Sequence, residues 1–311
     1  MNKHKMQILQ ELAKKNGPLC VGLDTSPKYF PENLIKELGG EACVLEYNKK
    51  LINAVTAENL ACCFKIQIAY YEAMGLAGMK IYADTLKAVK DSGVIAISDI
   101  KRGDIAATAD AYAKAHFTGD FETDIITVNP YMGFDTLKPF TSYAAPELGG
   151  KGAFVLLCTS NPGMVDIEHQ ELKAGGLLLD RVGNELTRIG DEYKASYADQ
   201  TCYPVGAVVG ATQEKDARIL RDRYPNMFFL IPGYGAQGGA ARIAATLLDK
   251  AGGAVNSSRG ILCAWQKDPE LAEKRDAGTV TIEDMVKSAV KACKTSKEEL
   301  IASAIEVNGK Y

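Results

Sequence analysis

The sequence repeats one pattern eight times: a short apolar run rich in Val, Ile, Ala and Cys, then polar residues, then a helical stretch. Continuous apolar strands that alternate with helices indicate a parallel sheet covered by helices, and eight such units predict an α/β fold of the (β/α)8 barrel type. An open, doubly wound sheet is the alternative, but no glycine-rich dinucleotide turn follows the first run. The runs are residues 19–24, 61–67, 94–100, 124–130, 153–160, 205–211, 228–233 and 253–260.

A chain of 311 residues suits one large barrel or two ordinary domains. We expect residues 1–311 to form a single barrel domain, because no second set of apolar strands is present. Residues 161–204 are longer than the other connections and predict an enlarged loop with an extended fifth helix. The tail after Trp265 is predicted to be helical and to close the barrel.

Composition narrows the class of partner. The net charge is −3 and no basic stripe is present, so we expect a small-molecule substrate and neither nucleic acid nor a membrane. The eight cysteines form no CxxC pair and are predicted to be buried free thiols of a reducing compartment. The N-terminal segment is charged and no run reaches transmembrane length, which predicts a cytoplasmic protein.

The stretch AISDIKRGDIAAT places three charged residues at the end of an apolar run. Ala96 to Ile100 is predicted to be a strand, on which Asp99 and Lys101 share a face because they are two residues apart. Asp104 falls where a helical pattern begins, so its carboxylate is expected to reach back over the strand end or to cap the helix. Buried charges are costly unless they are paired, so this cluster indicates an active site. A structural ion pair with a helix cap is the alternative.

Lys65 lies inside another apolar run and needs a carboxylate nearby, for which Asp99 on the neighbouring strand is the candidate. The pattern predicts an alternating array of Lys65, Asp99, Lys101 and Asp104, with each cation between two anions. None of the three histidines lies at a predicted strand end, so histidine acid–base chemistry and a metal site are not expected. The lysines would also compete with a metal ion for the carboxylates.

A phosphate site is predicted at the last two strands, where barrels of this type often bind phosphate. The loop PGYGAQGG, residues 232–239, precedes a helix that is expected to begin near Gln237, and its backbone N–H groups suit an anion. Arg259 ends the eighth run and can bind phosphate oxygens in a fork. For the glycine-rich loop alone, a plain tight turn is the alternative.

Six stretches in order carry a resemblance to a known family: GLDTSP, FKIQIAYYE, SDIKRGDI with Thr108, CTSNPG, PGYGAQGG and SSRGI. The chain resembles orotidine 5′-phosphate decarboxylase, in the longer variant of that family. The resemblance implies cofactor-free loss of CO₂ from orotidine 5′-monophosphate to give uridine 5′-monophosphate, the last step of de novo pyrimidine synthesis.

The resemblance also assigns roles to residues of the charged cluster. Lys101 would protonate C6 of the pyrimidine, and Asp99 would lie beside the departing carboxylate. Lys65 and Asp24 would hold the ribose hydroxyls and the charged network.

The remaining roles concern the rest of the substrate and a second subunit. Ser160 would contact the pyrimidine edge, with Thr159 as the alternative, and Gln237 and Arg259 would bind phosphate. Asp104 and Thr108 would enter the site of the other subunit, which implies a homodimer with shared active sites.

Two positions depart from the family's common pattern. Shorter members carry Lys-x-His-x-Asp on the second strand, whereas this chain has Lys65, Gln67 and Ala69. Two other functions remain open: a metal-dependent sugar-phosphate decarboxylase or aldolase of the same barrel type, and a non-catalytic nucleotide-binding barrel. The first would need a strand-two carboxylate for its metal, and the second would need a missing catalytic group.

Overall fold

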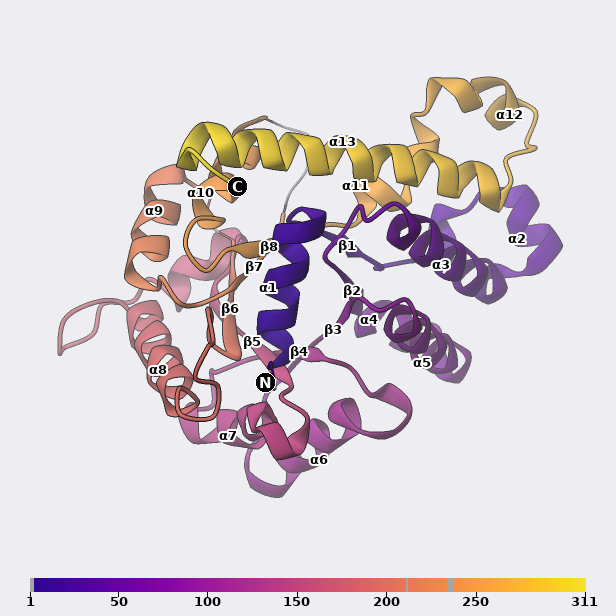
Figure 1. Ribbon diagram of the computed structural model, residues 1–311. Coiled ribbons are helices and arrows are strands. Elements are labelled where there is room, and N and C mark those ends of the chain that lie inside the picture. The colour runs from indigo at the N-terminus through magenta and orange to yellow at the C-terminus, as the bar shows by residue number, and fades with distance from the viewer. Residues whose placement is uncertain (1–2, 211, 234–237) are drawn as a thin grey trace.

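The eight apolar runs form eight parallel strands that close into a barrel in chain order, in a computed structural model that describes residues 3–210, 212–233 and 238–311 (Figure 1). This architecture confirms the predicted (β/α)8 barrel. The strands are β1 Leu19–Gly22, β2 Cys63–Gln67, β3 Ile95–Arg102, β4 Ile125–Val128, β5 Gly152–Cys158, β6 Val205–Val209, β7 Phe229–Ile231 and β8 Gly253–Ser257.

Helices surround the barrel on its outside, as expected for strands that are apolar on both faces (Figure 1). The helices that follow strands β1 to β4 are α2 Glu32–Leu38, α3 Gly40–Ala57, α4 Ile68–Glu72, α5 Gly75–Asp91, α6 Ala106–Phe117 and α7 Lys138–Thr141. Those that follow β5 to β8 are α8 Leu178–Glu192, α9 Glu214–Arg223, α10 Gly238–Leu247, α11 Arg259–Leu262, α12 Ala272–Asp276 and α13 Ile282–Asn308.

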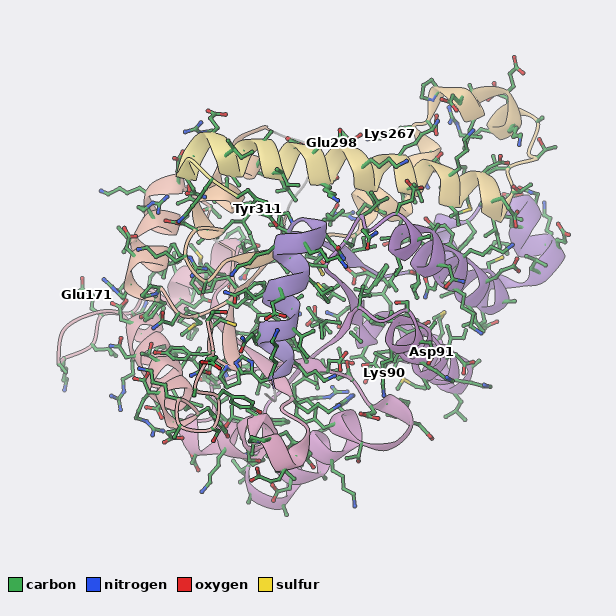
Figure 2. The ribbon with its side chains drawn as sticks, in the orientation of Figure 1. Lys90, Asp91, Glu171, Lys267, Glu298 and Tyr311 are labelled. Carbon is green, nitrogen blue, oxygen red and sulfur yellow. The ribbon has the colours of Figure 1, made fainter. Side chains whose placement is uncertain are left out.

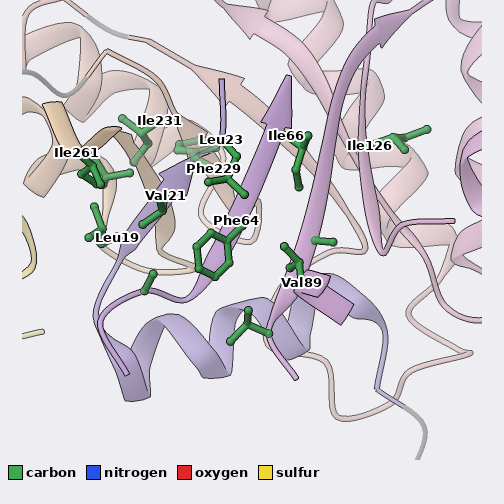
Figure 3. Close-up of a cluster of buried hydrophobic side chains, with 14 of the residues drawn as sticks. Leu19, Val21, Leu23, Phe64, Ile66, Val89, Ile126, Phe229, Ile231 and Ile261 are labelled. Carbon is green, nitrogen blue, oxygen red and sulfur yellow. The ribbon is translucent and has the colours of Figure 1, made fainter. Parts of the chain in front are cut away.

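Alternating side chains of each strand face the helices and the barrel interior. Val21, Phe64 and Ile126 belong to the outer apolar layer, where they pack with helix residues (Figure 3). Cys63 and Phe154 belong to a second buried cluster inside the barrel. The two layers explain why each strand reads as a continuous apolar run.

A helix before the first strand, α1 Lys5–Asn16, closes the amino-terminal end of the barrel. Its Met6, Leu9 and Ala13 side chains pack against the interior cluster, and Figure 1 shows the helix lying across the barrel. Because this end is filled with apolar groups, the polar interior positions are confined to the carboxyl end of the strands.

The long connection after β5 contains a projecting loop and one helix. An isolated antiparallel β-bridge pairs Glu171 with Leu177 across the loop. Figure 2 shows Glu171 at the outer edge of the molecule. Helix α8 then packs against β5 and β6. This layout agrees with the expected enlargement at 161–204, while the assignment of one domain stays a prediction.

The C-terminal tail is helical, as predicted. Helix α13 begins with a capping box between Thr281 and Asp284 and packs along α3 and α10. Tyr311, labelled in Figure 2, donates a hydrogen bond from its hydroxyl to the Ala13 carbonyl at 2.6 Å. The last residue of the chain therefore contacts the C-terminal part of α1. No helix in the described ranges has the length and apolar character needed to cross a bilayer.

All eight cysteines are free thiols, and seven of them are buried. Cys263 is the partly exposed one. This confirms the prediction of unpaired thiols, which fill apolar space as small hydrophobic side chains do.

We predict that folding stability declines below neutral pH because of His4. This residue caps α1 through Nδ1, its Nε2 lies 3.1 Å from the Cys202 carbonyl, and burial lowers its pKa from 6.5 to about 4. Between those two values only the unfolded chain takes up the proton, so the free energy of unfolding should fall by about 2 kcal/mol from pH 7 to pH 5 through His4 alone.

Urea unfolding at both pH values measures this effect. In His4→Asn, which keeps a capping side chain, the decline should be smaller by that amount. An equal decline in the variant and the parent would contradict the assignment.

Candidate active site

Lys65 lies near the carboxyl end of β2 with its ammonium group buried between two carboxylates. Its Nζ is 3.0 Å from Asp24 Oδ1 and 3.0 Å from Asp99 Oδ2. Strand β2 pairs with both β1 and β3, so the barrel brings the three residues together from neighbouring strands. The predicted partnership of Lys65 and Asp99 is therefore present, and Asp24 is the second anion beside the lysine.

Burial and charge oppose each other in this cluster. Burial alone would raise the pKa of Asp99, but the ammonium groups of Lys65 and Lys101 outweigh it and lower that pKa to about 2. Burial would likewise lower the pKa of Lys65, but Asp99 and Asp24 hold it above its ordinary value. All of these shifts keep the ionised forms in place at neutral pH.

Lys101 reaches the same cluster from the end of β3. Its Nζ is 2.6 Å from Asp99 Oδ1, and its side chain is 46% exposed, so the ammonium can meet a ligand as well as its carboxylate partner. Its backbone is left-handed, with φ at +44°, which is uncommon for a residue with a side chain. Asp99 and Lys101 are thus in contact, but through an irregular stretch of β3 and not through the regular strand alternation that was predicted.

A buried hydrogen-bond network supports the segment that carries Asp24. Thr25 donates from Oγ1 to Asn48 Oδ1 at 2.7 Å, and Asn48 donates from Nδ2 to the Tyr71 hydroxyl at 2.9 Å. Tyr71 donates to the Leu23 carbonyl at 2.9 Å. The residues on both sides of Asp24 are thus fixed by helices α3 and α4.

A cavity of about 240 Å³ opens above this cluster at the carboxyl mouth of the barrel. Ser160 lines it, while the neighbouring Thr159 uses both its backbone N–H and its hydroxyl on Glu168, at 2.9 and 2.7 Å. The Ser160 hydroxyl has no hydrogen-bond partner among the residues that the structure describes, whereas the Thr159 hydroxyl is occupied, and this difference distinguishes the two candidates for a ligand contact. The lining residues are Lys65, Asp99, Lys101, Thr127, Leu156, Thr159, Ser160, Asn161, Val208, Leu230, Pro232 and Asn256.

Of the predicted phosphate residues, the structure describes one. Arg259 is the first residue of α11, is exposed, and forms no ion pair with any residue in the described ranges. Its guanidinium is therefore available to an anion. Gln237 lies outside the described residues, and the helix expected there begins at Gly238.

The predicted place of Asp104 in the array is wrong for a single chain. Asp104 Oδ1 accepts from the backbone N–H of Ile105 at 2.8 Å, and the residue neither caps α6 nor pairs with a lysine in the described part of the chain. Lys101 accordingly contacts one carboxylate and not two. The physical reason is that the chain turns away after Arg102, and Thr108 follows as an exposed residue of α6.

The departure from the family's second-strand pattern has a local explanation. Gln67 caps the short helix α4 by accepting from the Ala69 N–H at 3.3 Å. This position therefore stabilises the strand-to-helix turn.

Three further site residues were missed in the sequence. Thr127 of β4 lines the cavity and binds Asp99, Glu168 holds Thr159, and Asn256 of β8 lines the cavity. Thr127 and Asn256 interrupt apolar runs, which is the signal that could have found them. Glu168 lies in an irregular loop, where no pattern marks it.

Among the residues that the structure describes, no three His, Cys, Asp or Glu side chains are placed to hold a metal ion. The carboxylates of the cluster contact lysines instead.

Together, the fold and the site define a (β/α)8-barrel enzyme with a lysine–carboxylate cluster at the carboxyl mouth, where such barrels carry their chemistry. The family model described as "Orotidine 5′-phosphate decarboxylase / HUMPS family" matches residues 17–274. The chain belongs to this family.

Curated relatives are similar in sequence to this chain over most of its length. The orotidine 5′-phosphate decarboxylase of Clostridium perfringens strain 13 is 45% identical over 287 residues, which cover 91% of this chain and 98% of the relative. That of Clostridium tetani is 49% identical over 261 residues, which cover 83% and 88%. Among solved structures, the orotidine-monophosphate decarboxylase of Leishmania donovani has a TM-score of 0.70 at 28% identity and covers 97% of this chain and 99% of its own.

We predict that Lys65→Met destabilises the fold at neutral pH. The change leaves Asp24 and Asp99 close together with their shared cation removed, so the free energy of unfolding should fall by about 3 kcal/mol. The loss should shrink as the pH is lowered, because a protonated carboxyl no longer repels its neighbour.

Denaturant unfolding at several pH values measures this change. Lys80→Met is the matched control, since Lys80 pairs with Asp84 on the exposed surface of α5 and should matter little. Equal effects of the two substitutions would show that the buried pairing is not what stabilises the barrel.

Proposed function

We infer that this chain is a carboxy-lyase that converts orotidine 5′-monophosphate to uridine 5′-monophosphate and CO₂, the last step of de novo pyrimidine synthesis. The observation that carries the proposal is the Lys101 ammonium, 2.6 Å from the Asp99 carboxylate, at a cavity of about 240 Å³. The near-full-length similarity to curated decarboxylases supports the same reaction.

The proposed chemistry uses Lys101 as electrostatic stabiliser and acid. When the bond between C6 and the carboxylate breaks, CO₂ leaves and the electron pair stays on C6. A fixed ammonium near C6 stabilises that charge and then transfers a proton to the carbon. These are the two contributions that a cofactor would otherwise supply, so we propose that none is needed.

Asp99 has two roles in this proposal. Its ionised carboxylate holds the Lys101 ammonium at the cavity, and it lies beside the position proposed for the substrate carboxylate. Repulsion between the two carboxylates would disappear as CO₂ leaves, which favours the transition state over the bound substrate. Lys65 and Asp24 hold Asp99 in position and offer polar groups to the ribose.

The remaining predicted residues are proposed to contact the pyrimidine edge and the phosphate of the substrate. Ser160 lines the cavity with a hydroxyl that no residue in the described ranges binds, and it is proposed to contact the pyrimidine edge, while Thr159 is held by Glu168. Arg259 is proposed to bind the phosphate together with Gln237. A guanidinium with no carboxylate partner among the described residues fits this role.

We further propose a cytoplasmic homodimer in which Asp104 and Thr108 of one subunit complete the site of the other. Asp104 has no cationic partner in the described part of its own chain, and Thr108, one helical turn further on, is exposed. Ile105, Tyr131 and Met132 are exposed apolar residues after β3 and β4, as expected of an interface. A second copy would cover these residues and give Asp104 a lysine to pair with.

Orotidine 5′-monophosphate should be consumed without added metal. The loss of its ultraviolet absorbance measures turnover, and a parallel reaction with a chelator should proceed at the same rate. Absence of turnover by the folded protein would end the proposal. Activity that the chelator abolishes would favour the metal-dependent sugar-phosphate alternative, and retention of uridine 5′-monophosphate binding without turnover would favour a non-catalytic barrel.

Mixed dimers test the shared site. Lys101→Ala should lower kcat at least about 100-fold, because the acid is lost, and should still bind uridine 5′-monophosphate. Asp104→Ala should also be strongly impaired. When the two inactive variants are mixed under conditions of subunit exchange, each heterodimer regains one intact site, so about a quarter of the parental activity should return. No recovery despite demonstrated exchange would contradict a site built from two chains.

A further inference from the structure

Strand β3 leaves its regular pairing where it carries the charged residues. Ile97 and Ser98 pair with β4, and pairing resumes at Arg102, with an irregularity between Ser98 and Arg102. The backbone N–H groups of the bulged residues therefore need other acceptors.

The hydroxyl of Thr127 on β4 supplies them. Its Oγ1 accepts from the N–H groups of Ile100 and Lys101, both at 2.9 Å, and donates to Asp99 Oδ1 at 2.8 Å. A hydroxyl offers one donor and two acceptor positions, so all three are used. Thr127 is buried, and within the described ranges no other single side chain binds all three residues of the bulge.

The contacts join the two groups on which the proposed chemistry depends. Lys101 is in the left-handed region at φ +44°, where a residue with a side chain is strained and needs support from its surroundings. The bond to its N–H holds that conformation, which directs the side chain back to Asp99. The bond to Asp99 Oδ1 fixes the carboxylate oxygen that also meets Lys101 Nζ at 2.6 Å.

We propose that Thr127 is a positioning residue for decarboxylation. Its hydroxyl holds the backbone of Lys101 and the carboxylate of Asp99 in the positions that the reaction requires. The proposal rests on the proposed function. It predicts that the hydroxyl, and not the volume of the side chain, is what the site requires.

Thr127→Val keeps the shape and removes the hydroxyl. It should lower kcat by roughly 10- to 100-fold, as expected when two buried N–H groups and a carboxylate lose their partner. KM should change little because the phosphate contacts lie elsewhere. Thr127→Ser keeps the hydroxyl and should retain near-parental kcat.

Thr123→Val is the matched control. Thr123 is a buried threonine just before β4 that donates to the Ala96 carbonyl at 2.9 Å, at the other end of the same strand pair. Losing that bond should cost stability without a change in kcat. The proposal is overturned if Thr127→Val keeps kcat within about twofold of the parent. Equal impairment of Thr127→Ser and Thr127→Val, or of Thr123→Val and Thr127→Val, would also overturn it.

A second measurement does not depend on the reaction. Amide hydrogen exchange at Ile100 and Lys101 should accelerate in Thr127→Val and not in Thr123→Val. If the parent fails to turn over orotidine 5′-monophosphate, the proposed function fails, while this exchange result still decides whether Thr127 holds the bulge. If Thr127→Val does not fold, the kcat of Thr127→Ser decides, and a large loss there contradicts the proposal.

Discussion

The burial of one ammonium group between two carboxylates is the interaction on which the site depends. Lys65 cannot be placed in the barrel interior without anions on both sides, and Asp24 and Asp99 are brought there by the two strands that pair with β2. The positive charge of Lys65 helps to keep Asp99 ionised, and the ionised Asp99 in turn holds the Lys101 ammonium at the carboxyl mouth of the barrel. Lys101 is thus oriented by a charge network in which Lys65 and Asp99 are buried.

The structure separates stability from chemistry along the barrel axis. At the amino-terminal end, α1 and interior residues such as Cys63 and Phe154 form an apolar cluster. At the carboxyl end, the same interior positions carry Lys65, Asp99 and Thr127. Side chains alternate along each strand, so the outward-facing residues remain apolar and packed against the helices up to the carboxyl end. The inward-facing residues at that end can therefore be polar without loss of the outer apolar layer.

The barrel, its strand order and the contact of Lys65 with Asp99 could be predicted from the sequence, because apolar periodicity and the cost of a buried charge are both local signals. The place of Asp104 could not, since it depends on where the chain turns after Arg102. Thr127 is marked in the sequence as a polar residue within an apolar run, but its role could not be predicted, because that role arises from a bulge in the neighbouring strand. Glu168 acts from an irregular loop that no periodicity describes. The sequence therefore shows which charges must pair, while backbone irregularities decide which neutral groups support them.

The position of α1 has a consequence for the order in which the molecule assembles. This first helix is tied to segments made much later: the Lys5 N–H donates to the Gly150 carbonyl, and the Gln10 amide donates to the Ala251 carbonyl at 2.7 Å. Both acceptors follow α1 in the chain by more than a hundred residues, and Ala251 lies beyond β7. Helix α1 can therefore dock fully only after these later segments have been synthesised, and until then its apolar face is exposed.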